Sequence, residues 1–134
     1  MKTKNVIALE DYIYEIPVEV FLGSKQQAIN YLNKYHAVKY TENAFQNCEA
    51  LTIEITSAKG GYTLFIWLPA FADNIQKYSV FMHEICHASS AILRLSGIRH
   101  GQKNDETFAY LASYLFKTLL FKIQEHNKNK GNRK

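Results

Sequence analysis

The sequence of 134 residues has few of the features that mark secreted or membrane-spanning proteins. It contains two prolines and only two cysteines, Cys48 and Cys86, which are too few for a disulfide framework and fit a reducing cytoplasm. The longest uninterrupted apolar run, residues 64–68, is far shorter than the roughly 20 residues that cross a bilayer. Acidic residues follow the basic start, so we expect no signal peptide and no membrane partner.

The residues that are present indicate one folded domain. Hydrophobic residues make up 47% of the chain and charged residues 21%, and nine tyrosines and eight phenylalanines supply large core side chains. The net charge of +4 resides at the end of the chain, where positions 122–134 hold five Lys or Arg and one Glu. The rest of the chain is neutral, which argues against a folded nucleic-acid-binding face. We therefore expect a domain over residues 1–125 and a basic disordered tail over residues 126–134.

Three segments carry strand patterns. Residues 16–22 (IPVEVFL) are short and β-branched, residues 51–56 (LTIEIT) alternate between apolar and polar, and residues 63–68 (TLFIWL) are apolar on both faces. The third segment is therefore expected to be the central strand of a mixed three-stranded sheet. The alternating segment is expected to be an antiparallel edge strand, joined to the central one by a Gly-Gly turn at residues 60–61.

Three helices complete the predicted α+β domain. A backing helix over residues 25–36, capped by Ser24, connects the first strand to the central strand as a parallel crossover. The second helix has Asp73 as its expected N-cap and stops at Gly97. The last helix runs from about residue 105 to 125, and its surplus of apolar positions predicts burial in a homodimer. Its main apolar stripe consists of Phe108, Leu111, Leu115 and Leu119.

Residues 83–87 read HEICH, the H-E-x-x-H pattern, within the second predicted helix. His83 and His87 are four residues apart, so both imidazoles lie on one helix face and can reach one ion. Imidazole nitrogen binds zinc at about 2.0–2.1 Å. Glu84 is rotated about 100° around the helix, so we expect it to deprotonate the zinc-bound water rather than to bind the metal. The alternative interpretation is a half-buried, hydrogen-bonded His pair in an amphipathic helix.

A catalytic zinc needs a third protein ligand, for which the sequence offers two candidates. His100 lies in the loop between the last two helices, and Glu106 lies in the first turn of the last helix. An antiparallel return through a short loop would bring that turn back toward the motif, which favours Glu106. The carboxylate could instead only interact with the helix dipole. The remaining histidines, His36 and His126, are isolated in the sequence and are expected to face solvent.

His83-Glu84-x-x-His87 followed by Glu106 resembles the gluzincin zinc metallopeptidases. The chain is most similar to their smallest members, the minigluzincins, and to short prophage-encoded metallopeptidases, in which a Glu likewise precedes an Ala-Tyr-Leu segment, as in residues 105–111 here (DETFAYL). The resemblance covers about residues 50–120. It implies a zincin-like domain with a small three-stranded mixed sheet, a backing helix, an active-site helix and a glutamate helix.

The same resemblance implies a functional site. One Zn²⁺ would be bound by His83, His87 and Glu106, and Glu84 would be the catalytic general base. The edge strand would hold a substrate peptide by strand addition. The residues of that strand are Leu51, Thr52, Ile53, Glu54, Ile55 and Thr56.

The sequence departs from the larger gluzincins at two points. They often carry an Asp four residues after the glutamate ligand, where this chain has Tyr110; its hydroxyl could hydrogen-bond a ligand histidine, or its ring could belong to the core. They also have a C-terminal subdomain that supplies an oxyanion stabiliser, and nothing after Glu125 can build one. His100 and Tyr114 are the candidate substitutes. Without such a group, activity would be low.

We therefore expect a zinc-dependent peptidase that acts on a peptide or protein substrate. Glu84 would pass the proton it takes from water to the leaving amine. The alternative is a catalytically weak or inactive zinc-stapled interaction protein associated with a phage or mobile element. The small size and the apolar last helix favour that alternative.

Overall fold

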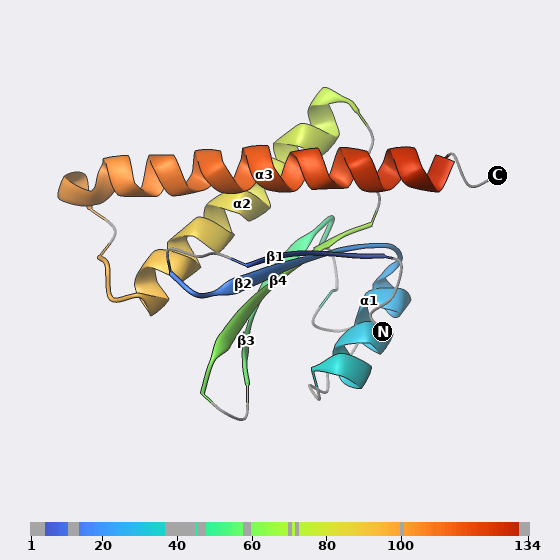
Figure 1. Ribbon diagram of the computed structural model, residues 1–134, viewed down its shortest axis with the longest axis horizontal. Helices are drawn as coiled ribbons and strands as arrows, with labels where there is room; N and C mark the ends of the chain where they lie inside the picture. The colour runs from blue at the N-terminus through green and yellow to red at the C-terminus, as the bar shows by residue number, and fades with distance from the viewer. Residues whose placement is uncertain are drawn as a thin grey trace.

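The strands and helices of the protein form three layers in the computed structural model, which describes residues 5–10, 14–36, 45, 48–57, 60–69, 71, 73–99 and 101–131. In this part of the chain one sheet of four strands has the order β1-β2-β4-β3 (Figure 1). The strands are β1 (Val6–Glu10), β2 (Pro17–Leu22), β3 (Leu51–Thr56) and β4 (Tyr62–Leu68). The helices are α1 (Lys25–Tyr35), α2 (Ile75–Leu95) and α3 (Asp105–Gly131), and a 3₁₀ turn, Gln102–Asn104, precedes α3.

The sheet has β4 inside and β3 at one edge, as the apolar patterns predict. Strand β2 runs parallel to β4, with Val18 opposite Leu64. Strand β3 runs antiparallel to β4, with Leu51 opposite Trp67. The predicted parallel pair, the antiparallel edge strand and the single α+β domain are confirmed.

The prediction of three strands is wrong, because the described chain forms a fourth strand, β1. This strand pairs antiparallel with β2, with Ile7 opposite Val20. Ile7 and Leu9 are buried against the helices on one face of the sheet. The run VIALE is short and lies between polar segments, so its own pattern is weak; pairing with the edge of β2 stabilises it as a strand.

Alternation along β2 and β4 divides the core between the two faces of the sheet. Val20 and Leu64 pack with α2 and α3, whereas Phe21 and Phe65 pack with α1. Figure 1 shows α2 and α3 together on one side of the sheet and α1 on the other. Helix α2 packs over β3 and β4, while α3 packs over β1. The helix that carries the H-E-x-x-H pattern therefore lies beside the edge strand.

The ends of the first two helices follow local rules. Ser24 and Gln27 form a reciprocal capping box at the start of α1, so the predicted cap is confirmed. At the end of α2, Gly97 has φ of +81°, and the N–H of Ile98 donates to the carbonyl of Leu93 at 2.8 Å. This is the Schellman arrangement that a C′ glycine permits.

The predicted N-cap of α2 is wrong by one residue. The cap is Asn74, whose Oδ1 accepts from the backbone N–H of Lys77 at 2.9 Å. Asp73 instead accepts a hydrogen bond from the hydroxyl of Tyr78. Both residue types are good N-caps, so local propensity alone does not separate the two positions.

Helix α3 continues past the predicted end at Glu125 as far as Gly131. Residues 126–131, which the sequence assigned to a disordered tail, therefore form its last turns, and residues 132–134 lie outside the described residues. Lys128 and Lys130 lie in the last turn, where positive charge interacts favourably with the helix dipole.

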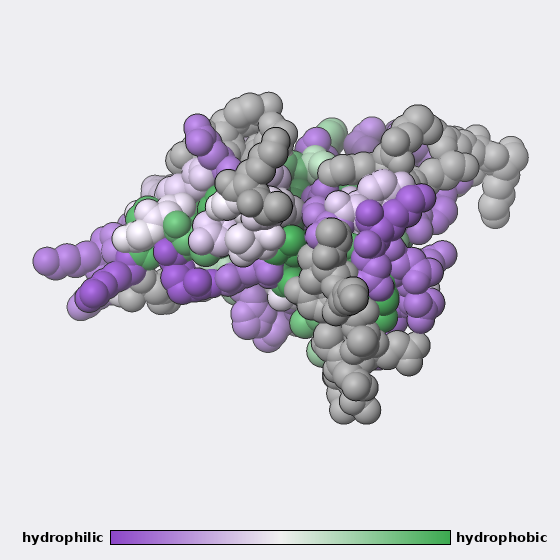
Figure 2. Space-filling view, turned by 90° about the horizontal axis from the view of Figure 1, so that it is seen from below, coloured by the Kyte–Doolittle hydropathy of each residue, from purple (hydrophilic) through white to green (hydrophobic). Residues whose placement is uncertain are grey.

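The surface of the described chain is mainly polar. None of its helices combines the length and the apolar character that a bilayer span requires. Seen from below (Figure 2), the coloured part of the surface is mostly hydrophilic or intermediate, and apolar side chains show as small areas between. The aromatic and aliphatic residues of the sequence are thus used mainly in the two core clusters.

Candidate functional site

The two imidazoles of the H-E-x-x-H pattern meet on the exposed side of α2. His83 Nε2 and His87 Nε2 are 3.1 Å apart, and the ring centroids are 4.7 Å apart. Residues four apart lie one above the other on a helix, and Phe81, Ile85 and Ala88 turn the opposite side of α2 into the core. Both imidazoles are therefore exposed, unlike the half-buried pair of the alternative interpretation. The 3.1 Å between the two Nε2 atoms is a hydrogen-bond distance, as that interpretation expected.

Glu84 lies between this pair and the edge strand and is only 5% exposed. The hydroxyl of Thr52 in β3 donates to Glu84 Oε1 at 2.7 Å. A buried carboxylate is costly without a hydrogen-bond donor, and the edge strand supplies that donor. Thr52 therefore fixes the position of the carboxylate beside His83. The sequence identified Thr52 only as a strand residue, because its contact spans 32 positions and has no local pattern.

The polar face of β3 points toward α2. Besides the bond between Thr52 and Glu84, Glu54 forms an ion pair with Arg94 of α2. The other face of the strand carries Ile55, which is buried in the cluster on the α1 side. The alternation of residues 51–56 predicted one apolar and one polar face, and only the tertiary structure gives the polar face a helical partner.

Glu106, the predicted third ligand, lies in the first turn of α3 with an exposed side chain. Helix α3 turns Leu111, Leu115 and Leu119 inward, and at about 100° per residue Glu106 falls roughly on the opposite side. Over the described ranges, no group of three or more His, Cys, Asp or Glu side chains is arranged to hold a metal ion. The structure does not bring Glu106 to the imidazole pair, and its role as a ligand stays a prediction.

Two of the candidate supporting residues, Tyr110 and Tyr114, lie in α3 with exposed side chains. Tyr110 is 72% exposed and Tyr114 is 39% exposed. Among the described residues, neither hydroxyl is hydrogen-bonded to His83 or His87. His100 lies outside the described residues. The proposed contributions of these three residues therefore stay predictions.

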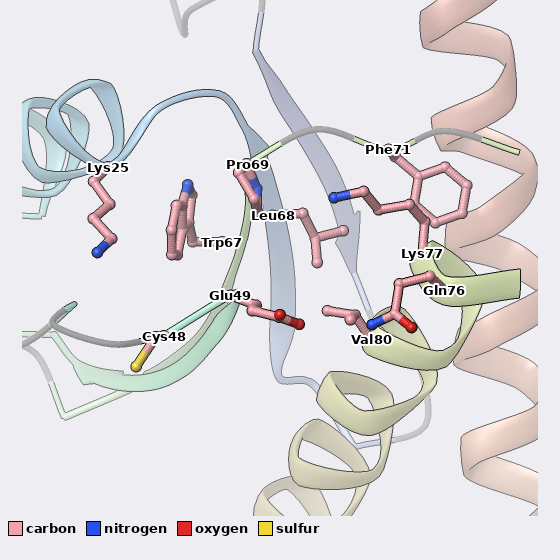
Figure 3. Close-up of a pocket in the computed structure, with 10 residues that line it drawn as sticks. All are labelled: Lys25, Cys48, Glu49, Trp67, Leu68, Pro69, Phe71, Gln76, Lys77 and Val80. Carbon is pink, nitrogen blue, oxygen red and sulfur yellow. The ribbon is translucent and has the colours of Figure 1, made fainter. Parts of the chain in front are cut away.

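Two pockets adjoin the start of β3. The smaller, of about 340 Å³, is lined by Glu49, Ala50, Ser79, Val80, His83 and Glu84. The larger, of about 400 Å³, shares Glu49 and Val80 with it and extends to the end of β4 (Figure 3). The two pockets therefore share part of their walls, and the smaller one reaches His83 of the imidazole pair. Pockets of this size accommodate small ligands or side chains of a peptide.

A second polar cluster lies on the α1 side of the sheet. Glu19 of β2 is buried and accepts a hydrogen bond from the hydroxyl of Tyr31 at 3.1 Å, while His36 Nε2 lies 2.7 Å from the same carboxylate oxygen. The side chain of His36 is 15% exposed, so the prediction that it faces solvent is wrong. Burial, and then the neighbouring Glu19 charge, raise the pKa of Tyr31.

Comparison with known proteins gives no relative for this chain. No family model, no curated protein and no solved structure matches it. The resemblance to gluzincins therefore rests on the motif residues alone.

The imidazole pair fits two positions of a zinc site. Two nitrogens bound at about 2.0–2.1 Å to one tetrahedral ion lie about 3.3–3.4 Å apart. The observed separation of 3.1 Å is close to that spacing. A catalytic zinc needs a third protein ligand, which the described residues do not place beside this pair. The arrangement can thus hold an ion through two side chains and offers Glu84 as a proton acceptor next to them.

Proposed function

We propose that the chain is a zinc-dependent peptidase whose reaction centre consists of His83, Glu84 and His87. The observation that carries the proposal is the approach of the two Nε2 atoms to 3.1 Å beside a buried carboxylate. The exposed imidazoles and the adjoining pocket leave room for a substrate. An edge strand, β3, lies next to the site, and among the described residues no strand pairs with its outer side, where a peptide chain could add.

The roles of the side chains follow from their chemistry. Zinc bound at this place would supply Lewis-acid chemistry that polarises a peptide carbonyl. Glu84 would accept a proton from the attacking water and deliver it to the leaving amine. The hydroxyl of Thr52 would keep the carboxylate in position for both transfers. Glu106 is proposed as the third ligand, which requires the first turn of α3 to rearrange when the metal binds.

Zinc binding and peptide cleavage test the proposal in the full chain. Calorimetric titration should give about one zinc per chain, and His83→Ala should weaken binding by about 100-fold or more because it removes a ligand. Glu84→Gln should bind zinc like the wild type and lose cleavage of denatured casein. His126→Ala is the matched control and should change neither measurement. A zinc-loaded Glu84→Gln variant with wild-type cleavage would exclude Glu84 as the base.

The third ligand is tested separately. Glu106→Gln should lower zinc affinity by about 10-fold or more, because it replaces a charged ligand with a weaker neutral one. Glu125→Gln removes the same charge from the far part of α3 and should leave affinity unchanged. Equal affinity in the Glu106→Gln variant and the wild type would remove Glu106 from the proposed site and leave the imidazole pair.

The second candidate function is a zinc-stapled interaction protein without turnover. The exposure of the imidazole pair favours it, because a side chain of another molecule could complete the coordination. Zinc would then raise the melting temperature of the protein by binding the folded state, and a chelator would reverse the shift. Casein would stay intact in the presence and absence of the chelator.

A further inference from the structure

The larger pocket has the composition of a site for a carboxylate attached to an apolar side chain. We propose that it binds the C-terminal residue of a peptide, with the side chain against Trp67 and Leu68 and the α-carboxylate between Lys25 and Lys77 (Figure 3). The inference rests on the proposed peptidase function. It makes the protein an enzyme that removes short fragments from the C-termini of peptides.

Two lysines supply the positive charge of this pocket. Lys25 is the first residue of α1, and Lys77 lies in the first turn of α2. In the view of Figure 3 the side chain of Trp67 stands between that of Lys25, from α1, and that of Lys77, from α2. Both are partly buried, and across the described residues no ion pair joins either ammonium group to a carboxylate. A partly buried ammonium group is screened less by salt than an exposed one and so attracts an anion more strongly.

The floor of the pocket is apolar and fixed in place. Trp67 and Leu68 end the central strand and are each only 2% exposed. Pro69 and Phe71 continue the apolar lining. The indole N–H of Trp67 donates to the carbonyl of Gly23 at 2.8 Å, which holds the ring. An apolar side chain that binds in this pocket would transfer its surface from water to an apolar lining, and it would break no hydrogen bond of that lining.

The direction of β3 leads the end of a bound peptide to this pocket. A peptide that adds antiparallel to β3 points its C-terminus toward Leu51, where the strand begins. Glu49 lies just before that residue and lines both pockets. The last residue of the bound peptide would therefore arrive between the ends of β4, α1 and α2.

The spacing along α2 sets which bond would be cleaved. Lys77, which is proposed to bind the carboxylate, and Glu84 are seven residues apart, or about 10 Å along the helix axis. An extended peptide advances about 3.3 Å per residue, so the bond beside Glu84 lies about three residues from the bound carboxylate. In the hydrolysis the oxygen of water bonds to the carbonyl carbon, the C–N bond breaks and the leaving nitrogen takes a proton. The released fragment is about three residues long.

Trp67 is the single tryptophan of the chain, so its fluorescence can report ligand binding in this pocket in the absence of metal and of catalysis. The probes are acetyl-Gly-Leu as the free acid and as its C-terminal amide, titrated into the full chain with chelator present. We expect the free acid to change the fluorescence of Trp67 and to bind at least about tenfold more tightly than the amide. Added salt should reduce that preference.

Charge variants localise the effect. Lys25→Gln and Lys77→Gln should each reduce the preference for the acid to about threefold or less. Glu49→Gln should increase it, because a negative charge at the pocket is removed. Lys117→Gln, on the exposed part of α3, is the matched control and should keep the full preference. Equal loss in the Lys117→Gln variant would mean that only net charge matters and would overturn the assignment.

The comparison of acid and amide in the wild type does not depend on any variant folding. Equal binding of the two probes, or no fluorescence change with either, would overturn the proposal. If zinc-dependent cleavage were as fast for C-terminally amidated peptides as for the free acids, the assignment of the pocket would also be overturned. The proposed peptidase function would then still stand. Acid-selective binding without any cleavage in zinc would support the pocket and reject the peptidase function.

Discussion

Two buried carboxylates show how single contacts decide the role of a residue. Glu84 receives the hydroxyl of Thr52, and Glu19 receives the hydroxyl of Tyr31 and lies beside His36. Each carboxylate would be costly to bury without these groups. The partners come from other strands or helices, so the sequence marks neither carboxylate as buried.

The pKa of Tyr31 predicts how stability depends on alkaline pH. Burial and the Glu19 charge raise its pKa in the folded protein, whereas an unfolded tyrosine titrates at about 10. Below that pH both states keep the proton. Above it the unfolded chain loses a proton that the folded protein retains. The free energy of unfolding should therefore fall by up to about 1.4 kcal/mol per pH unit through this group.

Denaturant unfolding between pH 8 and 11 measures this effect. Tyr31→Phe should be less stable at pH 8 by about 1–3 kcal/mol, because Glu19 loses a donor, and should show a shallower fall above pH 10. Tyr110→Phe, on the exposed side of α3, is the matched control and should retain the wild-type profile. An unchanged slope in the Tyr31→Phe variant would contradict the assignment to this hydroxyl.

At the level of secondary structure, the rotation of each helix about its axis decides which side chains face the core and which can take part in the candidate site. In α2, the phase set by Phe81, Ile85 and Ala88 leaves both imidazoles exposed together. In α3, the phase set by its buried leucines turns Glu106 away from the core. The spacing of the motif fixes the first arrangement within one helix, whereas a third ligand depends on the relative rotation of two helices.

The end of α2 gives a prediction about backbone conformation. Gly97 has φ of +81°, a region in which a side chain is strained, and no atom lies within 4 Å of a Cβ added there. Gly97→Ala should therefore lower the free energy of unfolding by about 1 kcal/mol through the backbone alone. Gly101→Ala is the control, because Gly101 has an extended φ of −178° and equally open surroundings. Urea denaturation of both variants measures the difference, and equal stabilities would contradict the argument.

The whole molecule is joined by its central strand. Leu64 and Ile66 of β4 belong to the core cluster under α2 and α3, and Phe65 and Trp67 belong to the cluster over α1. If β4 left the sheet, the apolar residues of both clusters would be exposed to water. The two faces of the sheet should therefore unfold together.

Two spectroscopic probes test this cooperativity. The fluorescence of Trp67 reports on the α1 side, while far-UV circular dichroism is dominated by α2 and α3, with 21 and 27 residues. Their transition midpoints in urea should coincide. A fluorescence transition at lower urea than the dichroism transition would show that the α1 side unfolds separately.

The assembly of the molecule stays a prediction. The expected homodimer was attributed to the apolar positions of the last helix beyond its main stripe, which are Phe116, Leu120, Phe121 and Ile123. Of these, Ile123 is buried and Phe116 and Leu120 are partly buried against the core, whereas Phe121 is exposed. Among the described residues of α3, the large exposed side chains are Tyr110 at 72%, Phe121 at 64% and Tyr114 at 39%.

The sequence by itself determined the parts of this protein that depend on nearest neighbours and on periodicity. Alternation identified β3 as an edge strand and β4 as a central one, Ser24 and Gly97 marked helix ends, and the four-residue spacing of His83 and His87 placed both rings on one face. These features are decided by backbone geometry over a few residues.

Only the tertiary structure decided what those parts face. It added β1 to the sheet, carried α3 through the expected tail, set Thr52 against Glu84 and turned Glu106 to the outside. Each of these outcomes depends on how two distant segments are rotated and placed against each other. That placement is fixed by burial summed over the whole core, and no local stretch of sequence contains it.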